Sequence, residues 1–226
     1  MSPETTSGYR LRILHLSDLH ERGTREDKSW RRERVLGDAW EDNLSILLQD
    51  GPVDLVCFTG DVADWGKAQE YEAATGFLEA LLARLSLGKD RLFVISGNHD
   101  IARPIAQDAW HRLRERGQEG IDTQALSRWM AGHAGPPPGI EPAWQEQILA
   151  RQAAYRDWVR AILGRPDLDP KHSPHGFLGY RATVHLHGWD FGVHILGLDT
   201  AWLAGDDADA GRLRLTEDQL MRLATD

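Results

Sequence analysis

Three short apolar segments, each followed by polar residues, constrain the fold of this chain most strongly. The segments are residues 11–16, 53–58 and 91–95, and a helical pattern separates each from the next. This alternation predicts right-handed crossovers and a largely parallel sheet. The carboxyl ends of parallel strands lie at one edge of a sheet. The polar residues that follow the three segments are therefore expected to converge.

Two helical patterns connect these segments. They are predicted over residues 27–49 and 67–87, where apolar residues recur at the spacing of one helix face. Gly51 and Pro52 end the first pattern, and Gly88 is a plausible end signal for the second. The apolar faces consist of Trp40, Leu44, Leu47 and Leu48 in the first pattern, and of Tyr71, Ala74, Leu78, Leu81, Leu82 and Leu85 in the second.

The second half of the chain differs in composition. Residues 101–176 are rich in Trp, Arg, Gln, Gly and Pro, and they are predicted to form a helical insertion over or beside the strand ends. Within them, residues 143–163 have the pattern of one continuous amphipathic helix. Residues 177–187 and 191–199 then alternate like two antiparallel strands. The apolar side of the predicted helix consists of Trp144, Ile148, Tyr155, Trp158, Val159 and Ile162.

The last residues carry a helix start signal. Thr216 and Gln219 have the spacing of a capping box, and the chain stops at Asp226, barely two turns later. We interpret residues 10–226 as one domain that lacks its C-terminal part, with downstream domains of a longer chain as partners. A short terminal helix is the alternative interpretation.

Charge and cysteine content narrow the function classes. The formal net charge of −9 argues against sequence-independent binding of nucleic acid as the main task, because that task needs a basic face. Cys57 is the only cysteine, which excludes a disulfide within the chain and a cysteine-rich zinc site. We interpret it as a buried small apolar residue. The sequence has no apolar run long enough to span a membrane and no signal-peptide core, so a cytoplasmic location is expected.

Two carboxylates and a histidine follow the first two strands. Asp18 and His20 are two residues apart, so on an extended segment their side chains point the same way and can bind one ion. Asp61 follows Gly60, and its two carboxylate oxygens could bridge two ions. A carboxylate and an imidazole suit Mn, Fe, Zn or a similar metal. Each signal is weak alone, since a solvated loop end has the same residues.

The third strand end carries the strongest signal. Asn98 offers a neutral oxygen to a metal, and His99, if it is not a ligand, could donate a proton to a leaving or phosphoryl oxygen. Gly97 before them is expected to allow sharp backbone dihedrals. Asp64 could cap a helix at 65–67 or orient a histidine. Three such signals at three successive strand ends predict a two-metal phosphoesterase centre, with Asp100 among its crowded carboxylates.

The order of these motifs resembles that of the calcineurin-like metallophosphoesterases, closest to the bacterial cyclic-nucleotide phosphodiesterase-like branch. The resemblance covers residues 10 to 100 well and the later strands less surely. It implies an α/β fold in which a sandwich of two β-sheets is flanked by helices, an α/β/β/α arrangement. The matching runs are Ser17-Asp18-Leu19-His20, Gly60-Asp61-Val62-Ala63-Asp64 and Gly97-Asn98-His99-Asp100.

The resemblance also implies a role for each matching residue. Asp18 and His20 would bind the first of two divalent metal ions, manganese, iron, zinc or a similar metal, and Asp61 would bridge both. Asn98 would bind the second ion and touch the phosphate. His99 would serve the leaving group, with Asp64 holding its ring. The implied reaction is hydrolysis of a phosphoester, most simply a phosphodiester, and nucleotides are among the implied substrates.

The sequence departs from the family pattern in two places. The family completes its metal set with a further His and a Gly-His-x-His motif downstream, and neither is found within 226 residues. His185 and His187 share a strand face but are better explained as solvated residues. Trp65 stands where phosphoprotein phosphatases of the superfamily carry an Arg that grips phosphate. Two further readings stay open: a non-catalytic or regulatory module of a larger protein, and a nuclease, which the negative net charge disfavours.

Overall fold

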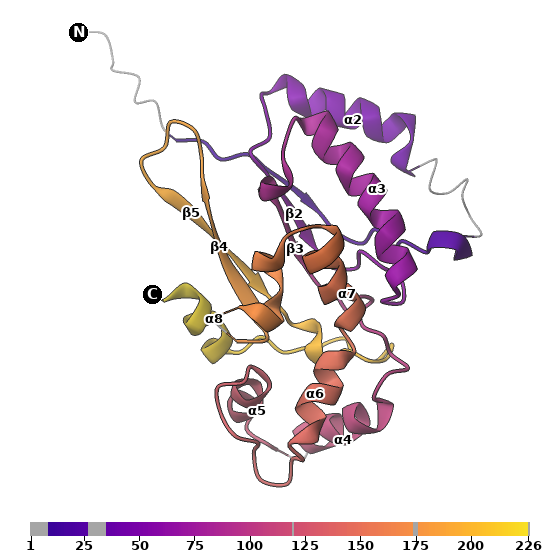
Figure 1. The fold of residues 1–226 in the computed structure, drawn as a ribbon, viewed down its shortest axis with the longest axis vertical. Helices are drawn as coiled ribbons and strands as arrows, with labels where there is room; N and C mark the ends of the chain where they lie inside the picture. Colours follow the sequence, from indigo (N-terminus) through magenta and orange to yellow (C-terminus); the bar gives the residue numbers. More distant parts are fainter. Residues whose placement is uncertain (1–8, 27–34, 119, 174–175, 226) are drawn as a thin grey trace.

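The computed structural model describes residues 9–26, 35–118, 120–173 and 176–225 (Figure 1). The strands are β1 (Ile13–Leu16), β2 (Leu55–Thr59), β3 (Leu92–Ile95), β4 (Gly179–His185) and β5 (Gly192–Leu198). The α-helices are α2 (Asp38–Gln49), α3 (Ala68–Leu85), α4 (Gln107–Gln118), α5 (Thr123–Met130), α6 (Ala143–Ala150), α7 (Ala153–Asp157) and α8 (Glu217–Ala224). Within the described ranges, no helix is both long and apolar enough to cross a membrane.

The first three strands form the predicted parallel sheet. Its order is β1-β2-β3, with Ile13 opposite Leu55 and Val56 opposite Leu92. All six apolar positions predicted for the face of the second helix are buried, and they pack in one hydrophobic cluster with the strand side chains. The α/β class and the parallel arrangement are therefore confirmed.

The second sheet is the predicted antiparallel pair. In it β4 pairs with β5, with Gly179 opposite Leu198 and His185 opposite Gly192. The hydroxyl of Tyr180 donates to the carbonyl of Val94 at 2.8 Å, which joins this sheet to β3. The main hydrophobic cluster contains side chains of both sheets. Figure 1 shows α2 and α3 on one side of the parallel sheet and the β4–β5 hairpin on the other.

Both connecting helices differ from prediction at their ends. α3 ends at Leu85. The left-handed backbone of the next residue, Ser86 (φ 58°), lets Leu87 donate to the carbonyl of Leu82, so Gly88 is not the end signal. In the first helix, a bend at Gly37 precedes α2. Residues 27–34 of that prediction lie outside the described residues. Leu47 is 37% exposed, while Leu44 is buried at the same helix surface.

The predicted continuous helix over 143–163 is wrong. It is divided into α6, α7 and a π-helical turn, Trp158–Ile162. The break falls at Arg151 and Gln152, because the carbonyl of Arg151 accepts from the backbone of Ala102 at 2.9 Å and the side chain of Gln152 bonds Asp199. These are contacts with distant segments, which a helical pattern does not reveal.

The helices between β3 and β4 contribute to two hydrophobic clusters. Side chains of α4, α5 and α6 pack together with Leu178 and Trp202 in a second cluster. Tyr155 and Trp158, from the later part of the same region, lie in the main cluster. Figure 1 shows α4, α5 and α6 grouped at one end of the molecule. The boundaries of a helical insertion at 101 and 176 stay a prediction.

Candidate metal centre

The loops after β1 and β2 are joined by their backbones. Asp18 donates to the carbonyl of Gly60 at 3.1 Å, His20 to that of Asp61 at 2.9 Å, and Glu21 to that of Val62 at 2.9 Å. The parallel hydrogen-bonding pattern therefore continues past the end of β1. It brings the Asp-x-His segment beside the Gly-Asp segment.

Two glycines allow the loops after β2 and β3 to touch. A Cβ on Gly60 would lie 2.8 Å from the Cα of Gly97, and a Cβ on Gly97 would lie 2.5 Å from the backbone nitrogen of Asp61. Gly60 has a φ of +100°, so it needs the dihedral freedom of glycine. Gly97 has no positive φ. The expectation of a sharp dihedral at Gly97 is therefore wrong. A glycine is needed at this position because the two backbones approach each other closely.

The backbone is strained at three of the candidate ligands. Asp18, His20 and Asp61 have φ values of 60°, 46° and 55°, and only two other non-glycine residues in the described part of the chain, Ser86 and Ala106, have a positive φ. Such conformations cost about 1–3 kcal/mol each and cluster at functional sites. The local geometry therefore marks these three residues as a site before any side-chain chemistry is considered.

The same three side chains form a group that could hold one metal ion. Their ligand atoms all lie within 4.8 Å of one another. Nε2 of His20 is 3.8 Å from Oδ1 of Asp18 and 3.9 Å from Oδ2 of Asp61. Two carboxylate oxygens and an imidazole nitrogen facing one point fit a divalent transition metal. The residues present thus fit the metal that their sequence pattern predicts.

Asp64 lies behind this group and faces two imidazoles. Its carboxylate is 3.4 Å from Nδ1 of His20, 3.2 Å from Nε of Arg22 and 3.9 Å from Nδ1 of His99. The contact to His20 is typical of metal-binding histidines, which turn their second nitrogen toward a carboxylate. The ring of His99 is fixed more closely by the backbone carbonyl of Asp64, 3.0 Å from Nδ1. No sequence motif predicts that Arg22 lies beside Asp64.

His99 and Asn98 lie beside this group and come from the third loop. The backbone of His99 donates to Oδ1 of Asp61 at 2.9 Å, and its ring meets that of His20 edge to face at 4.5 Å. Asn98 lines a cavity of about 460 Å³ together with Asp18 and Asp61. The structure thus brings all six predicted site residues to one edge of the sheet, as the strand order predicts.

Asp100 follows the candidate residues of the third loop, and its carboxylate faces donors of the protein. Its carboxylate is fully buried and accepts from the backbone nitrogens of Gly97 at 2.8 Å and Ala63 at 2.9 Å, and from the hydroxyl of Tyr71 at 3.1 Å. Burial raises its pKa to about 6, against the opposing effect of these hydrogen bonds. The nearby carboxylate of Asp61 raises this pKa further, which agrees with the expected crowding of carboxylates. Asp100 ties the second loop to the third.

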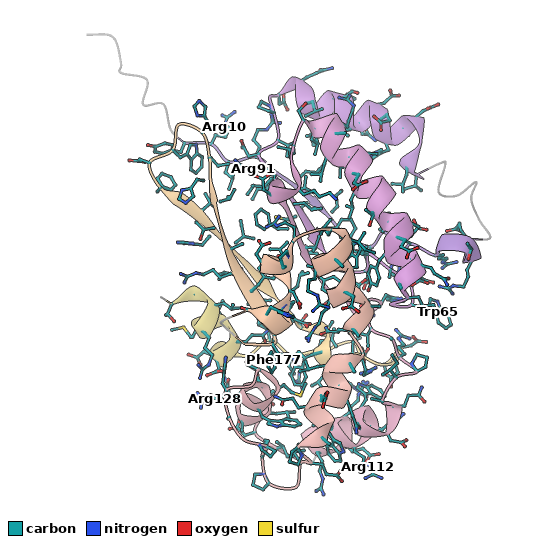
Figure 2. All side chains as sticks on the ribbon, in the orientation of Figure 1. Arg10, Trp65, Arg91, Arg112, Arg128 and Phe177 are labelled. Carbon is teal, nitrogen blue, oxygen red and sulfur yellow. The ribbon has the colours of Figure 1, made fainter. Side chains whose placement is uncertain are left out.

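Other side chains that the sequence singled out lie elsewhere. His185 and His187 are exposed at the end of β4, and neither belongs to a group of potential metal ligands in the described residues. Trp65 is 53% exposed and points outward (Figure 2), with Arg25 and Lys67 stacked 5.0 and 5.1 Å from its ring. Cys57 is half-buried against the main cluster, and burial raises the pKa of its thiol.

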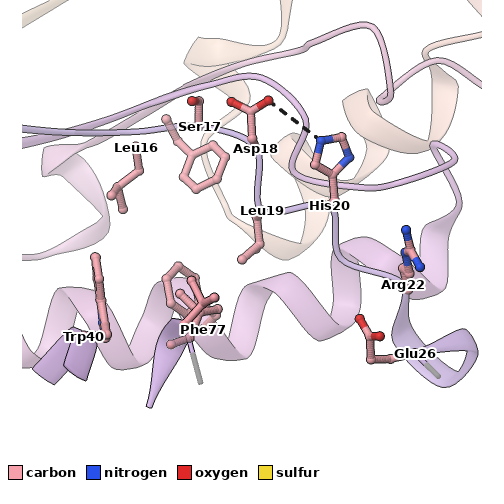
Figure 3. A pocket seen from close by; sticks show the side chains of 12 residues that line it. Leu16, Ser17, Asp18, Leu19, His20, Arg22, Glu26, Trp40 and Phe77 are labelled. Carbon is pink, nitrogen blue, oxygen red and sulfur yellow. Dashed lines mark ion pairs between the residues drawn. The ribbon is translucent and has the colours of Figure 1, made fainter. Parts of the chain in front are cut away.

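A second hollow lies beside the first loop. This cavity of about 400 Å³ has Asp18 and His20 at one side and mostly apolar side chains at the other, among them Leu19, Trp40 and Phe77 (Figure 3). The ion pair between Asp18 and His20 lies on the far side of the loop from these apolar groups in that view.

The parallel sheet, its loops and the Asp, His and Asn side chains at its edge have the arrangement that the motif resemblance implies. Residues 11–190 match the calcineurin-like phosphoesterase family, and the chain belongs to that family. It is also similar to the metallophosphoesterase-like protein YydB of Bacillus subtilis strain 168, with 28% identity over 98 residues. That match covers 43% of this chain and 19% of YydB, so the chain spans only a small part of this relative's length.

Proposed function

We propose that the chain hydrolyses a phosphodiester with a centre of two divalent metal ions. The observation that carries this proposal is the group formed by Asp18, His20 and Asp61 at one edge of the sheet. All three residues have a strained backbone conformation with a positive φ. Family membership supports metal-dependent hydrolysis of a phosphoester. The proposal goes further than family membership in three respects: a second metal ion, a preference for diesters and manganese as the metal.

Each residue has a role in this proposal. Asp18, His20 and Asp61 would hold the first ion, Asp61 would be shared with the second, and Asn98 would hold the second ion and contact the phosphate. Bound divalent ions would supply a water of lowered pKa and neutralise charge on the phosphoryl oxygens. Asp64 positions His20 through its carboxylate and His99 through its carbonyl. In this proposal, further ligands that the described residues do not supply would complete the centre.

His99 is proposed as the proton donor in the reaction. The attacking water gives up one proton to solvent and its oxygen forms a bond to phosphorus, the bond from phosphorus to the leaving oxygen breaks, and the leaving oxygen takes a proton from the ring of His99. The carbonyl of Asp64 accepts from Nδ1, which is 3.0 Å away. Because Nδ1 is held in this way, Nε2 is the nitrogen that faces the leaving group.

The wider context of the chain is also a proposal. We place it in a reducing, cytoplasmic compartment, where the single half-buried Cys57 acts as a packing residue. Nucleotides are the proposed substrates. The fold and partial metal shell would equally suit a regulatory module, which would bind metal without turnover.

The test is hydrolysis of bis-p-nitrophenyl phosphate in Mn²⁺ by the longest native form of the protein, with metal analysis of the same sample. We expect Asn98→Ala and His99→Ala to lower the rate about 10²-fold or more. The matched controls are Asn43→Ala on α2 and His187→Ala after β4, both at exposed positions. Unchanged hydrolysis in the first two variants would show that the assigned site is wrong. For residues 1–226 alone we expect weak metal occupancy and little turnover.

A further inference from the structure

A cavity next to the candidate metal centre has no role in the proposed reaction. It measures about 460 Å³ and is lined by Asn98, His99, Arg103, Leu213 and the acidic loop 206–211. Asn98 and Leu213 also line the cavity that contains Asp18 and Asp61. The two cavities are therefore neighbours, and this one lies on the side of His99, where the proposed leaving group departs.

The cation that lines this cavity is only loosely engaged. Nη1 of Arg103 is 2.9 Å from Oδ1 of Asp207, and the side chain of Asp207 is 98% exposed. An ion pair with so exposed a partner contributes about 0–1 kcal/mol, so another anion can displace Asp207. Its neighbours differ, because Asp206 and Asp209 pair with Arg114 at 3.1 and 2.8 Å.

A second guanidinium reinforces the positive charge behind the cavity. Arg151 is fully buried, and none of its three nitrogens has a hydrogen-bond acceptor among the described residues. It stacks on Trp110, 5.4 Å from the ring, and lies within electrostatic range of Arg103 and Asp209. Burial lowers its pKa to about 10, so it stays charged at neutral pH. A buried cation without an acceptor favours an anion nearby.

We propose that Arg103 binds an anionic group, a phosphate or carboxylate, which the leaving alcohol of the substrate carries. In the free protein Asp207 pairs with Arg103, and the anionic group of the substrate displaces it. The inference rests on the proposed function, because it places the leaving group on the side of His99. It narrows the substrate to phosphoesters whose leaving alcohol is itself charged. Arg103 is thus a specificity residue, and Asp207 is its internal competitor.

The test compares the two partners of one ion pair. Arg103→Ala and Asp207→Ala both break the contact, and a structural contact would shift the kinetics in the same direction in both variants. If Arg103 forms an anion site, KM for a charged substrate should rise in Arg103→Ala and fall in Asp207→Ala. The substrates are bis-p-nitrophenyl phosphate, with uncharged arms, and bis-p-carboxyphenyl phosphate, with charged arms. The control is Arg84→Ala, which breaks the surface pair with Glu41.

We expect Arg103→Ala to raise KM for the charged substrate about tenfold more than it raises KM for the uncharged substrate. A tenfold difference corresponds to the loss of one charge-assisted hydrogen bond. Asp207→Ala should lower KM for the charged substrate about twofold to fivefold, within the range of an exposed ion pair. Arg103→Lys should restore part of the loss. Equal effects on both substrates, or the same direction in both alanine variants, would overturn the inference.

A binding measurement separates this inference from the proposed function. Calorimetry of the Mn²⁺-loaded longest native form with phenyl phosphonate and p-carboxyphenyl phosphonate needs no turnover. Tighter binding of the carboxylated compound, lost in Arg103→Ala, supports the anion site. Equal binding of both compounds by the wild-type protein overturns it and leaves the metal centre standing. If the protein binds neither compound and does not bind Mn²⁺, both the proposed function and this inference are wrong.

Discussion

The loops at the strand ends and the helical stretch 143–162 are organised in opposite ways. In the loops, short runs of sequence meet through their backbones, as where Asp18 bonds Gly60 and a Cβ on Gly60 would collide with Gly97. In the helical stretch, a regular pattern is interrupted by side chains that bond distant segments, as where Gln152 reaches Asp199. Motifs therefore predict the first region, while tertiary contacts decide the second.

The largest effect that tests this comparison is expected at Asp100. Asp100→Ala would leave the backbone donors of Val62, Ala63 and Gly97 without their side-chain acceptor, while the hydroxyl of Tyr71 keeps the backbone carbonyl of residue 100 at 3.3 Å. At about 1–3 kcal/mol for each unsatisfied group, we expect unfolding free energy to fall by at least about 3 kcal/mol. Denaturant unfolding would measure this loss, and metal analysis should show weaker Mn²⁺ binding.

Asp100→Asn is the matched control because it keeps one acceptor oxygen at nearly the same volume. A smaller loss than in the alanine variant is expected. If Asp100→Ala were as stable as the wild type, the second and third loops would not depend on this carboxylate, and the backbone contacts alone would hold the site.

A smaller loss is expected from Gln152→Ala in the helical stretch. The amide of Gln152 donates to Oδ2 of Asp199 at 2.7 Å, and its oxygen accepts from Arg156 at 3.1 Å. Removing it leaves two buried charged groups with one partner fewer, so we expect a loss of about 2 kcal/mol. Metal binding should not change. Gln49→Ala, at the exposed end of α2, is the control, and an equal loss in both variants would contradict the comparison.

The sequence predicted the parallel sheet and the convergence of its six site residues, because strand order and strand polarity follow from local patterns. It did not predict that Arg22 lies beside Asp64, or that the carboxylate of Asp100 accepts a hydrogen bond from Tyr71. Nor did it predict that Gly97 is needed for close approach. In each case the deciding contact joins segments far apart in the chain, and no local spacing encodes it.

Asp199 should produce a pH-dependent effect. Burial raises the pKa of its carboxyl, so the folded protein binds this proton more tightly than the unfolded chain does. Its contribution to stability is then fully present below the unfolded pKa of about 3.9 and is lost as the pH rises through the folded pKa. We expect Asp199→Asn to flatten this part of the stability profile. Unfolding curves of both proteins across this pH range would measure it, and parallel profiles would contradict the prediction.

The smallest effect is expected at Ile162, and it tests the π-helical turn. A continuous helix would place Ile162 on the same side as Tyr155 and Trp158, but the turn Trp158–Ile162 inserts one residue. Leu163 then donates to the carbonyl of Trp158 at 2.8 Å and is buried instead, while Ile162 is 41% exposed. Ile162→Ser should therefore change the unfolding free energy by less than about 0.5 kcal/mol.

The contrast is Val159→Ala, at a fully buried position in the main cluster. It removes two methyl groups from the core, a loss of roughly 1.5 kcal/mol at about 0.8 kcal/mol for each buried carbon. Denaturant unfolding of the two variants side by side measures the difference. If Ile162→Ser were the more destabilising change, residues 153–163 would form one regular helix, because only an uninterrupted α-helical register turns Ile162 toward the core.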